Sequence, residues 1–242
     1  MAITNPESGT HVDEIADGVY RISTPVSVIP GGFTFNQFLI DDEAPLLFHT
    51  GLRRMFPLVR EAVAHVLGDA ARLRWVSFSH YEADECGSMN DWLQVAPGAQ
   101  PLCSQTAAMV SVNDVADRPA RALADGEELS LGRRTVRWLD TPHLPHGWES
   151  GLLFEIRSRT LLCGDLLTAG GADWAPLTGA DPLGPALEMH RAMPYLVHGP
   201  HVRPLLEKLA RTEPRVLGLM HGSSHEGDGG RALLALADAL RA

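Results

Sequence analysis

The chain has 242 residues, of which 45% are hydrophobic and 21% are charged, and its formal net charge is −10. This composition is typical of a globular protein and excludes a disordered segment. The acidic balance argues against general nucleic-acid binding, which leaves a basic footprint. No apolar run approaches the roughly 18–20 residues of a membrane helix, and residues 1–17 lack a signal-peptide pattern. We therefore expect no membrane or nucleic-acid partner.

The chain contains 11 histidines but a single lysine, Lys208. So much histidine raises the question of a metal site. The three cysteines, Cys86, Cys103 and Cys163, are odd in number and widely spaced, which excludes a disulfide framework and a cysteine-rich zinc or iron–sulfur site. Reduced thiols and the absence of an export signal predict a cytoplasmic protein.

In the first half of the chain, short apolar runs alternate with turn residues. They predict strands at Val19–Ser23, Phe35–Ile40, Leu46–His49, Leu73–Phe78 and Pro101–Cys103. Apolar residues at helical spacing predict helices at Phe56–Leu67, around Met89–Leu93 and around Gln105–Val112.

In the second half, strands are predicted at Glu128–Leu131, Thr135–Leu139, Leu152–Ile156, Thr160–Cys163 and Val216–Met220. Residues 165–185 predict a long loop, and helices follow at Pro185–Tyr195, His201–Arg211 and Arg231–Leu240. Strands and helices are thus mixed in two similar halves. This order predicts a single α/β (α+β) domain over residues 1–242, with two sheets and helices on their outer faces. No phosphate-binding glycine pattern supports nucleotide binding.

Residues that bind metals follow four of the predicted strands. His80, Glu82 and Asp84 follow the strand that ends at Phe78, and three further strands run into His146, Asp165 and His221. In an extended segment, side chains two residues apart point the same way, so His80, Glu82 and Asp84 are expected to project towards one point. Ligand sites gather where loops leave a rigid sheet.

At these residues the chain resembles the metallo-β-lactamase superfamily, whose fold is an αββα sandwich with a two-metal site along one sheet edge. Hydrolases of that superfamily carry an HxHxDH motif, whereas this chain reads His80-x-Glu82-x-Asp84-Glu85. A glutamate at the position of Glu82 is the pattern of the flavodiiron proteins and their stand-alone oxygen-binding diiron relatives. The resemblance covers nearly the whole chain.

This resemblance implies a set of metal ligands. One iron would be bound by His80, Glu82 and His146, the other by Asp84 and His221, and Asp165 would bridge both. The exchange of a histidine for a carboxylate favours iron or manganese over zinc. Two zinc or two manganese ions remain the alternatives to two iron ions.

Five further residues are expected near the ligands rather than among them: Glu85, His143, His225, Tyr81 and His49. Glu85 replaces a histidine that binds metal in many hydrolases, and an additional ligand role for it stays open. His49 stands where the superfamily usually has aspartate, which alters the support of the site. For His143, His225 and Tyr81, packing or a solvated loop is the commoner role.

The resemblance implies two alternative hypotheses about function. The first is a non-haem diiron protein that binds O2 or NO, with or without reducing it; the second is a metallohydrolase for a thioester, lactone or phosphoester. Glu82 argues against the hydrolase. A third hypothesis is a scaffold that has lost its metal site, and the six intact candidate ligands argue against it. The chain ends at Ala242, so we expect no FMN domain and an external electron donor such as a flavoprotein or rubredoxin. The resemblance also implies a homodimer, and no residue is assigned a catalytic role.

Overall fold

The computed structural model describes residues 1–241, and the predicted domain end at residue 242 lies outside them. Two β-sheets face each other. The first has eight strands in the order β1 to β8. Their bounds are β1 Ala2–Asn5, β2 Thr10–Ala16, β3 Val19–Val26, β4 Phe33–Ile40, β5 Leu46–Phe48, β6 Trp75–Ser77, β7 Gln100–Ser104 and β8 Arg121–Leu123. Pairing is antiparallel from β1 to β5 and parallel from β5 to β8.

The second sheet has seven strands in the order β13-β15-β14-β12-β11-β10-β9. Their bounds are β9 Glu128–Ser130, β10 Thr135–Asp140, β11 Gly151–Glu155, β12 Thr160–Leu162, β13 Leu177–Thr178, β14 Val216–Gly218 and β15 Ser224–Glu226. Strands β10, β12 and β14 run in the same direction, because β11 is antiparallel to both β10 and β12 and β12 is parallel to β14. Their carboxyl ends therefore meet at one edge of this sheet.

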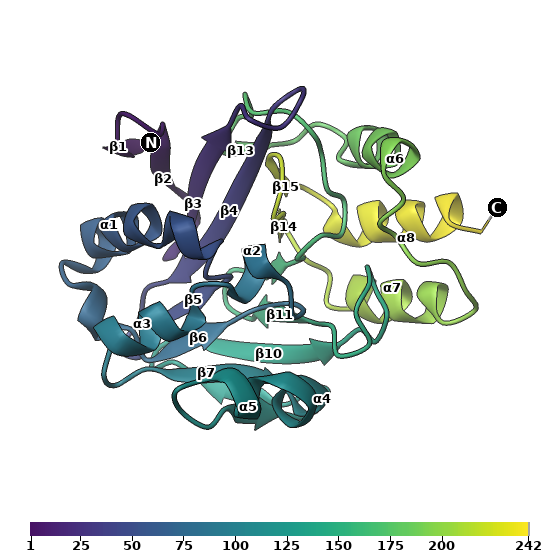
Figure 1. Cartoon of the computed structure of the whole chain (residues 1–242). Coiled ribbons are helices and arrows are strands. Elements are labelled where there is room, and N and C mark those ends of the chain that lie inside the picture. The colour runs from purple at the N-terminus through teal and green to yellow at the C-terminus, as the bar shows by residue number, and fades with distance from the viewer. Residues whose placement is uncertain (242) are drawn as a thin grey trace.

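Helices cover the outer faces of both sheets (Figure 1). Those on the side of the first sheet are α1 Phe56–Leu67, α2 Ala83–Cys86, α3 Met89–Val95, α4 Gln105–Ala107 and α5 Asn113–Val115, with a π-helical turn at Ala108–Val112. Those on the side of the second sheet are α6 Leu183–Ala192, α7 Val202–Ala210 and α8 Gly229–Ala239. Short 3-10 turns lie at Arg53–Met55 and Ala70–Arg72. The predicted αββα sandwich is confirmed.

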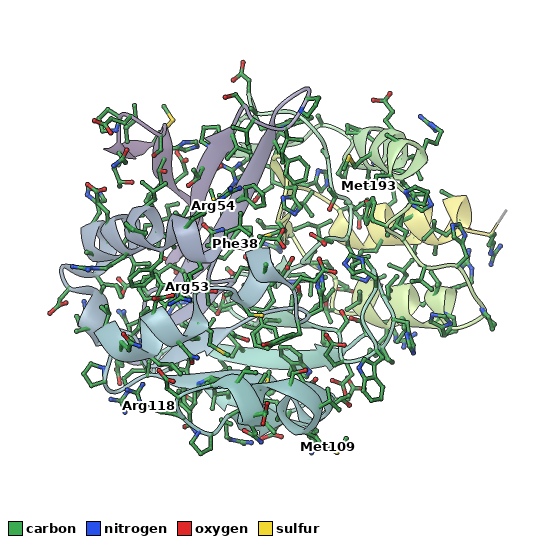
Figure 2. The ribbon with its side chains drawn as sticks, viewed as in Figure 1. Phe38, Arg53, Arg54, Met109, Arg118 and Met193 are labelled. Carbon is green, nitrogen blue, oxygen red and sulfur yellow. The ribbon has the colours of Figure 1, made fainter. Side chains whose placement is uncertain are left out.

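The apolar core has three layers. Between the sheets, Phe38, Phe48 and Trp138 belong to one fully buried cluster, and Figure 2 places Phe38 on β4. On the outer face of the first sheet, α1 buries Val59 and Val63, whose spacing puts them on one side of the helix. The helices over the second sheet bury a third cluster of mainly leucine side chains. Each sheet is therefore held from both sides by apolar packing.

Strands β1 and β2 add to the strands that the sequence predicted. β1 lies at the edge of the sheet, and β2 pairs with both β1 and β3. Two sequence-based assignments were wrong. The predicted loop over 165–185 contains the short strand β13, which pairs with β15. Helix α6 ends at Ala192, not Tyr195, because Met193 precedes a proline and takes an extended conformation.

Two general features of the chain follow from the described residues. Among residues 1–241, every helix is too short or too polar to cross a membrane. Cys86, Cys103 and Cys163 are all buried and free, as their spacing predicted. Burial raises the pKa of the Cys103 thiol to about 12, so this thiol is an uncharged filler of the core.

The layer between the sheets is expected to dominate stability. Phe38→Ala removes a fully buried ring there and should lower the free energy of unfolding by about 3–5 kcal/mol. Leu234→Ala on α8 is the control, because Leu234 is 39% exposed and its truncation should cost less than about 1 kcal/mol. Urea denaturation of the two variants measures both values. Equal losses would contradict this account of the core.

Candidate metal centre

The six predicted ligands come together where four strands end. His80 follows β6 of the first sheet, while His146, Asp165 and His221 follow β10, β12 and β14 of the second. A backbone hydrogen bond from Gly151 N–H to the Ser79 carbonyl, 2.8 Å long, ties the two sheets together beside His80. The site is therefore supported by both sheets at one common edge.

Three side chains surround one oxygen of Asp165. His146 Nε2 lies 3.4 Å from Asp165 Oδ2 and 3.3 Å from Glu82 Oε1. His80 Nε2 lies 3.7 Å from the same Asp165 oxygen and 3.8 Å from the same Glu82 oxygen. We call His80, Glu82, His146 and Asp165 Oδ2 the first half-site. Their donor atoms lie within 4.8 Å of one another, so one metal ion can contact all four.

The other oxygen of Asp165 faces a second group. His221 Nε2 lies 3.2 Å from Asp165 Oδ1 and 3.5 Å from Asp84 Oδ2. We call Asp84, His221 and Asp165 Oδ1 the second half-site. One carboxylate therefore serves both half-sites, each through a different oxygen, which is the arrangement required of a bridging ligand.

The segment after β6 differs from the extended conformation that its alternation predicted. The segment bends after His80, Glu82 is extended, with φ −129° and ψ 165°, and α2 begins at Ala83. Asp84 Oδ2 lies 3.5 Å from His221 Nε2, and a carboxylate oxygen of Asp84 lies within 4.8 Å of one of Glu82. A helical turn, rather than the alternation of an extended strand, therefore brings Asp84 to the cluster, where it faces His221 as the resemblance implied.

A chain of side chains orients His80. Its Nδ1 lies 3.0 Å from Ser79 Oγ, and that hydroxyl lies 3.1 Å from Nε2 of His49. If His80 binds a metal through Nε2, its Nδ1–H donates to Ser79, and the Ser79 hydroxyl donates to His49. This arrangement needs a neutral His49, and complete burial lowers the pKa of His49 to about 3. His49 thus supports His80 through Ser79.

Backbone carbonyls orient the other two histidines. His146 Nδ1 lies 3.0 Å from the Tyr195 carbonyl, and His221 Nδ1 lies 2.7 Å from the Thr34 carbonyl. A carbonyl only accepts, so both rings donate from Nδ1 and turn Nε2 towards the half-sites. The His221 ring also packs 4.2 Å from the ring of Phe33. In all three histidines, Nδ1 is therefore taken up by a hydrogen bond and Nε2 is left available to bind a metal ion.

The turn that carries His221 is pinned by the first sheet. Asn36 Nδ2 donates to the carbonyls of Leu219 and Gly222, and Arg21 donates to the same Gly222 carbonyl. Both side chains are fully buried. Because these bonds run from β3 and β4 to the end of β14, they set the position of His221 relative to the ligands that leave β6.

Glycine is required before the bridging aspartate. Gly164 has φ +52°, and a Cβ atom there would lie 2.6 Å from Ser79 Oγ. A larger residue would push away the hydroxyl that orients His80. The Gly-Asp pair, which alone is a common turn sequence, here serves the metal centre directly.

The four remaining candidate supporting residues differ in what their side chains contact. Glu85 lies beside the ligands, with Oε1 3.9 Å from His80 Nε2. Tyr81 is 39% exposed, and its backbone N–H, not its ring, donates to Glu149. His143 is exposed and pairs with His201, while His225 Nδ1 donates to the Ala180 carbonyl and lines other cavities. Exposure of His143 agrees with the solvated loop that was its commoner expected role, and a role of either histidine in support of the ligands stays a prediction.

The donor set fits a pair of metal ions. His80 Nε2 and Asp165 Oδ1 are buried and lack a hydrogen-bond partner among residues 1–241. Three of the six nitrogen–oxygen distances between these side chains, 3.2, 3.3 and 3.4 Å, match the about 3.0–3.4 Å between ligand atoms that share one metal ion at about 2.1 Å. The buried, unpartnered atoms therefore have a ready role as ligands.

A cavity of about 530 Å³ opens onto both half-sites. Its lining combines ligands with apolar side chains from the segment after α6, and includes Phe33, Thr168, Met193, Tyr195 and Val197. The Tyr195 hydroxyl is buried and has no hydrogen-bond partner among residues 1–241. The cavity thus offers a mostly apolar space beside the ligands.

In the second half-site, the histidine and the carboxylates shift each other's pKa in the direction that favours their charged forms. Burial lowers the pKa of His221, but Asp165 and Asp84 outweigh that effect and raise it to about 9. For Asp165, burial raises the pKa, and His221 in turn lowers it to about 2. Without metal, His221 is therefore protonated at neutral pH and pairs with the two carboxylates.

Comparison with known proteins agrees with this geometry. The model of the ODP family beta lactamases matches residues 33–222, a range that contains all six candidate ligands. The chain belongs to this family. The predicted resemblance to the metallo-β-lactamase superfamily and to the diiron module of flavodiiron proteins is confirmed.

Two curated relatives are oxidoreductases. The rubredoxin-oxygen oxidoreductase of Megalodesulfovibrio gigas is 26% identical over 168 residues, which cover 69% of this chain and 41% of the relative. The nitric oxide reductase of Moorella thermoacetica is 24% identical over 162 residues, or 61% of this chain and 39% of the relative. The chain therefore spans about two fifths of the length of these relatives.

Solved structures share the fold. The rubredoxin oxygen:oxidoreductase of Desulfovibrio gigas superimposes with a TM-score of 0.81 at 21% identity, over 94% of this chain and 61% of that one. The metal-soaked flavodiiron core of Synechocystis gives 0.80 at 18% identity, over 96% of this chain and 60% of that one.

Several residues of the centre had no signal in the sequence. Ser79 precedes a candidate ligand but belongs to no motif, and Tyr195 and Thr34 act through backbone carbonyls, which any residue provides. Arg21 and Asn36 lie more than 180 residues from the turn that they hold. Only the folded chain brings these contacts into view.

Metal binding should release a proton from His221. Binding through Nε2 requires loss of that proton while Nδ1–H stays on Thr34, so affinity should rise with pH up to about 9, by up to about tenfold per pH unit. Calorimetric titration of the metal-free protein with Co²⁺, in buffers of different ionisation enthalpy, measures the proton release. An affinity that does not change between neutral pH and pH 9 would contradict the assignment.

Proposed function

We propose that this protein is a non-haem diiron protein that binds O2 or NO in its cavity and reduces it. The observation that carries the proposal is the division of Asp165 between two half-sites, with Oδ2 facing His80 and His146 and Oδ1 facing His221. Two ions joined by one carboxylate, typically about 3.5–4 Å apart, suit a ligand that spans both metals. The oxidoreductase activities of the curated relatives support the same conclusion.

Glu82 supports this function over hydrolysis. It places a carboxylate in the first half-site where hydrolases of the superfamily have a histidine. A set of three imidazoles and three carboxylates without sulfur is harder than a zinc site rich in histidine, and it favours iron. The side chain is about half exposed at 51% and reaches the cavity, so its charge is also available to the bound molecule.

The side chains have distinct tasks in this proposal. Iron, when bound, would supply the binding position for the diatomic molecule and the electrons for its reduction. His80, Glu82 and His146 hold one ion, Asp84 and His221 hold the other, and Asp165 sets their separation. The apolar part of the cavity wall, including Phe33 and Val197, limits water around the site.

Continuous reduction needs an outside source of electrons. Reduction of O2 to water consumes more electrons than two ferrous ions supply, so repeated turnover requires a donor. We propose that this donor is a separate protein, either a rubredoxin or a flavoprotein. The name of the Megalodesulfovibrio gigas relative supports a rubredoxin for that protein, and this chain is 26% identical to it. Without such a donor the protein would bind O2 or NO without turnover.

Metal analysis tests the function directly. Protein purified under iron-sufficient conditions should contain about two irons per chain. Reduced protein should change its absorption spectrum on exposure to O2 or NO, and should consume the gas catalytically when a reductant is added. Apoprotein loaded with zinc is the control and should show no response. Two tightly held zinc ions, with no response after replacement by iron, would contradict the proposal.

Removal of Glu82 should affect one ion. Glu82→Ala takes away one of the donors of the first half-site and should reduce the metal content from about two ions per chain towards about one. Glu61→Ala on α1, where Glu61 is exposed and contacts Asn5, is the matched control and should keep both ions. Elemental analysis after dialysis gives the counts. Full metal content in Glu82→Ala would show that the ligand assignment is wrong.

A further inference from the structure

The segment that connects α6 to α7 (Figure 1) forms one wall of the cavity beside the ligands. Residues 193–197 all line that cavity, together with Met189 from α6 itself. The same segment carries the Tyr195 carbonyl, which lies 3.0 Å from Nδ1 of His146 in the first half-site. The position of this backbone therefore sets both the shape of the cavity and the orientation of one candidate ligand.

His190, in the last turn of α6, holds this segment. Its Nδ1 lies 3.3 Å from the backbone nitrogens of both Tyr195 and Leu196, so one ring nitrogen accepts a hydrogen bond from each. The His190 ring also packs edge-on against the Tyr195 ring, with the ring centroids 5.6 Å apart. A little further along, Val197 N–H donates to the Pro145 carbonyl. His190 thus fixes the part of the backbone that contacts the metal centre.

One peptide group joins His190 to His146. The Tyr195 carbonyl and the Leu196 N–H belong to the same planar peptide unit and point in opposite directions. The N–H donates to Nδ1 of His190, and the carbonyl accepts from Nδ1 of His146. Because the unit is rigid, a rotation that breaks the first hydrogen bond also turns the carbonyl away from His146. His190 therefore acts on the first half-site through a single peptide unit.

These hydrogen bonds fix where the proton of His190 lies. A ring nitrogen that accepts from N–H groups carries no proton, so neutral His190 carries its proton on Nε2. That nitrogen lies 3.2 Å from Nε2 of His198. His198 therefore accepts through Nε2 and carries its own proton on Nδ1. The two neutral rings form one hydrogen-bonded chain that runs from His198 through His190 to the backbone.

This chain has no place for an additional proton. A proton added to Nε2 of His198 would face the Nε2–H of His190, and a proton on Nδ1 of His190 would face two N–H groups. Burial and then His198 accordingly lower the pKa of His190, and no other charged group among residues 1–241 shifts it. The titratable groups that pack against His190 are His198 and Tyr195, while Glu188 and Arg191 are its charged neighbours on α6.

We propose that His190 is a positioning residue of the first half-site and that, with His198, it forms a latch on residues 193–197. The latch holds the segment while both rings are neutral and releases it when the pair gains a proton. This inference rests on the proposed dinuclear site and adds a means of regulation to it. Release lets the Tyr195 carbonyl turn away from His146, which weakens the first half-site and opens the cavity wall.

The direction of the pH dependence follows from the two states of the latch. The closed segment lowers the pKa of His190 from 6.5, so the closed segment binds a proton less readily than the released one. Closure is therefore most favourable above about pH 6.5 and becomes less favourable as the pH falls below that value.

Nitrogen NMR of the metal-free protein tests the latch itself. At neutral pH the ring shifts should place the proton of His190 on Nε2 and that of His198 on Nδ1. As the pair titrates, the amides of Tyr195 and Leu196 should exchange with solvent faster relative to their intrinsic rates. His190→Asn keeps an acceptor near the position of Nδ1 but does not titrate, so its amide protection should not follow this pH change. A proton on Nδ1 of His190 at neutral pH would overturn the latch.

Titration of Co²⁺ into the metal-free protein tests the link to the metal centre. Wild-type protein should bind about two ions per chain. His190→Leu removes the acceptor and should weaken the binding of one ion by about three- to tenfold, whereas His190→Asn should stay within about twofold of the wild type. His65→Leu on α1, where His65 is exposed, is the matched control and should bind both ions normally.

The outcomes separate the latch from the site on which it rests. If His190→Leu binds both ions as tightly as the wild type, His190 does not position His146. If His190→Asn is as weak as His190→Leu, the ring acts by packing and the acceptor role is overturned. If His190→Leu folds poorly, the NMR comparison of wild type and His190→Asn still decides. If wild-type protein does not take up two ions, the proposed dinuclear site fails, and the ring shifts decide separately whether the latch exists.

Discussion

The geometry of the candidate metal centre depends on the position of one carboxylate, that of Asp165. Asp165 must direct one oxygen towards His146 and the other towards His221, and these histidines follow different strands of the second sheet. The parallel directions of β10, β12 and β14 bring the three strand ends to one edge. Gly164 then permits the close approach of Ser79 from the first sheet. The αββα sandwich can thus be understood as a frame that holds these strand ends in register.

The frame places polar groups where an ordinary core would not. Each candidate histidine donates its Nδ1–H to a hydroxyl or a carbonyl, and this leaves its Nε2 towards a group of carboxylates. Buried oxygens such as those of Glu85 have no partner among residues 1–241. Such unpaired buried polar groups lower the stability of the metal-free protein, and the binding of cations would offset this loss. The apolar packing around Phe38 and beneath α1 supplies the stability that the centre lacks.

Access to the centre depends on the segment that follows α6. Tyr195 holds His146 through its carbonyl and lines the cavity, so this segment both orients a candidate ligand and forms the wall. Met193, labelled beside α6 in Figure 2, is 57% exposed and lines the same cavity. A single short stretch of backbone therefore links the geometry of the first half-site to the shape of the cavity.

The sequence by itself determined most of the helices and central strands, but not β1, β2 or β13, and it determined which residues are candidate ligands. Helix α1 has the predicted bounds Phe56–Leu67, because its apolar spacing and terminal Gly68 are local signals. The identity of Glu82, on which the proposal of iron rests, is also read directly from the sequence. Only the tertiary structure shows that Asp84 reaches His221 through the first turn of α2, and that His143 and His225 contact His201 and the Ala180 carbonyl. It also decided that Arg21 and Asn36 hold the turn of His221. These contacts join residues far apart in the chain, and their geometry depends on how the two sheets pack, which no local pattern encodes.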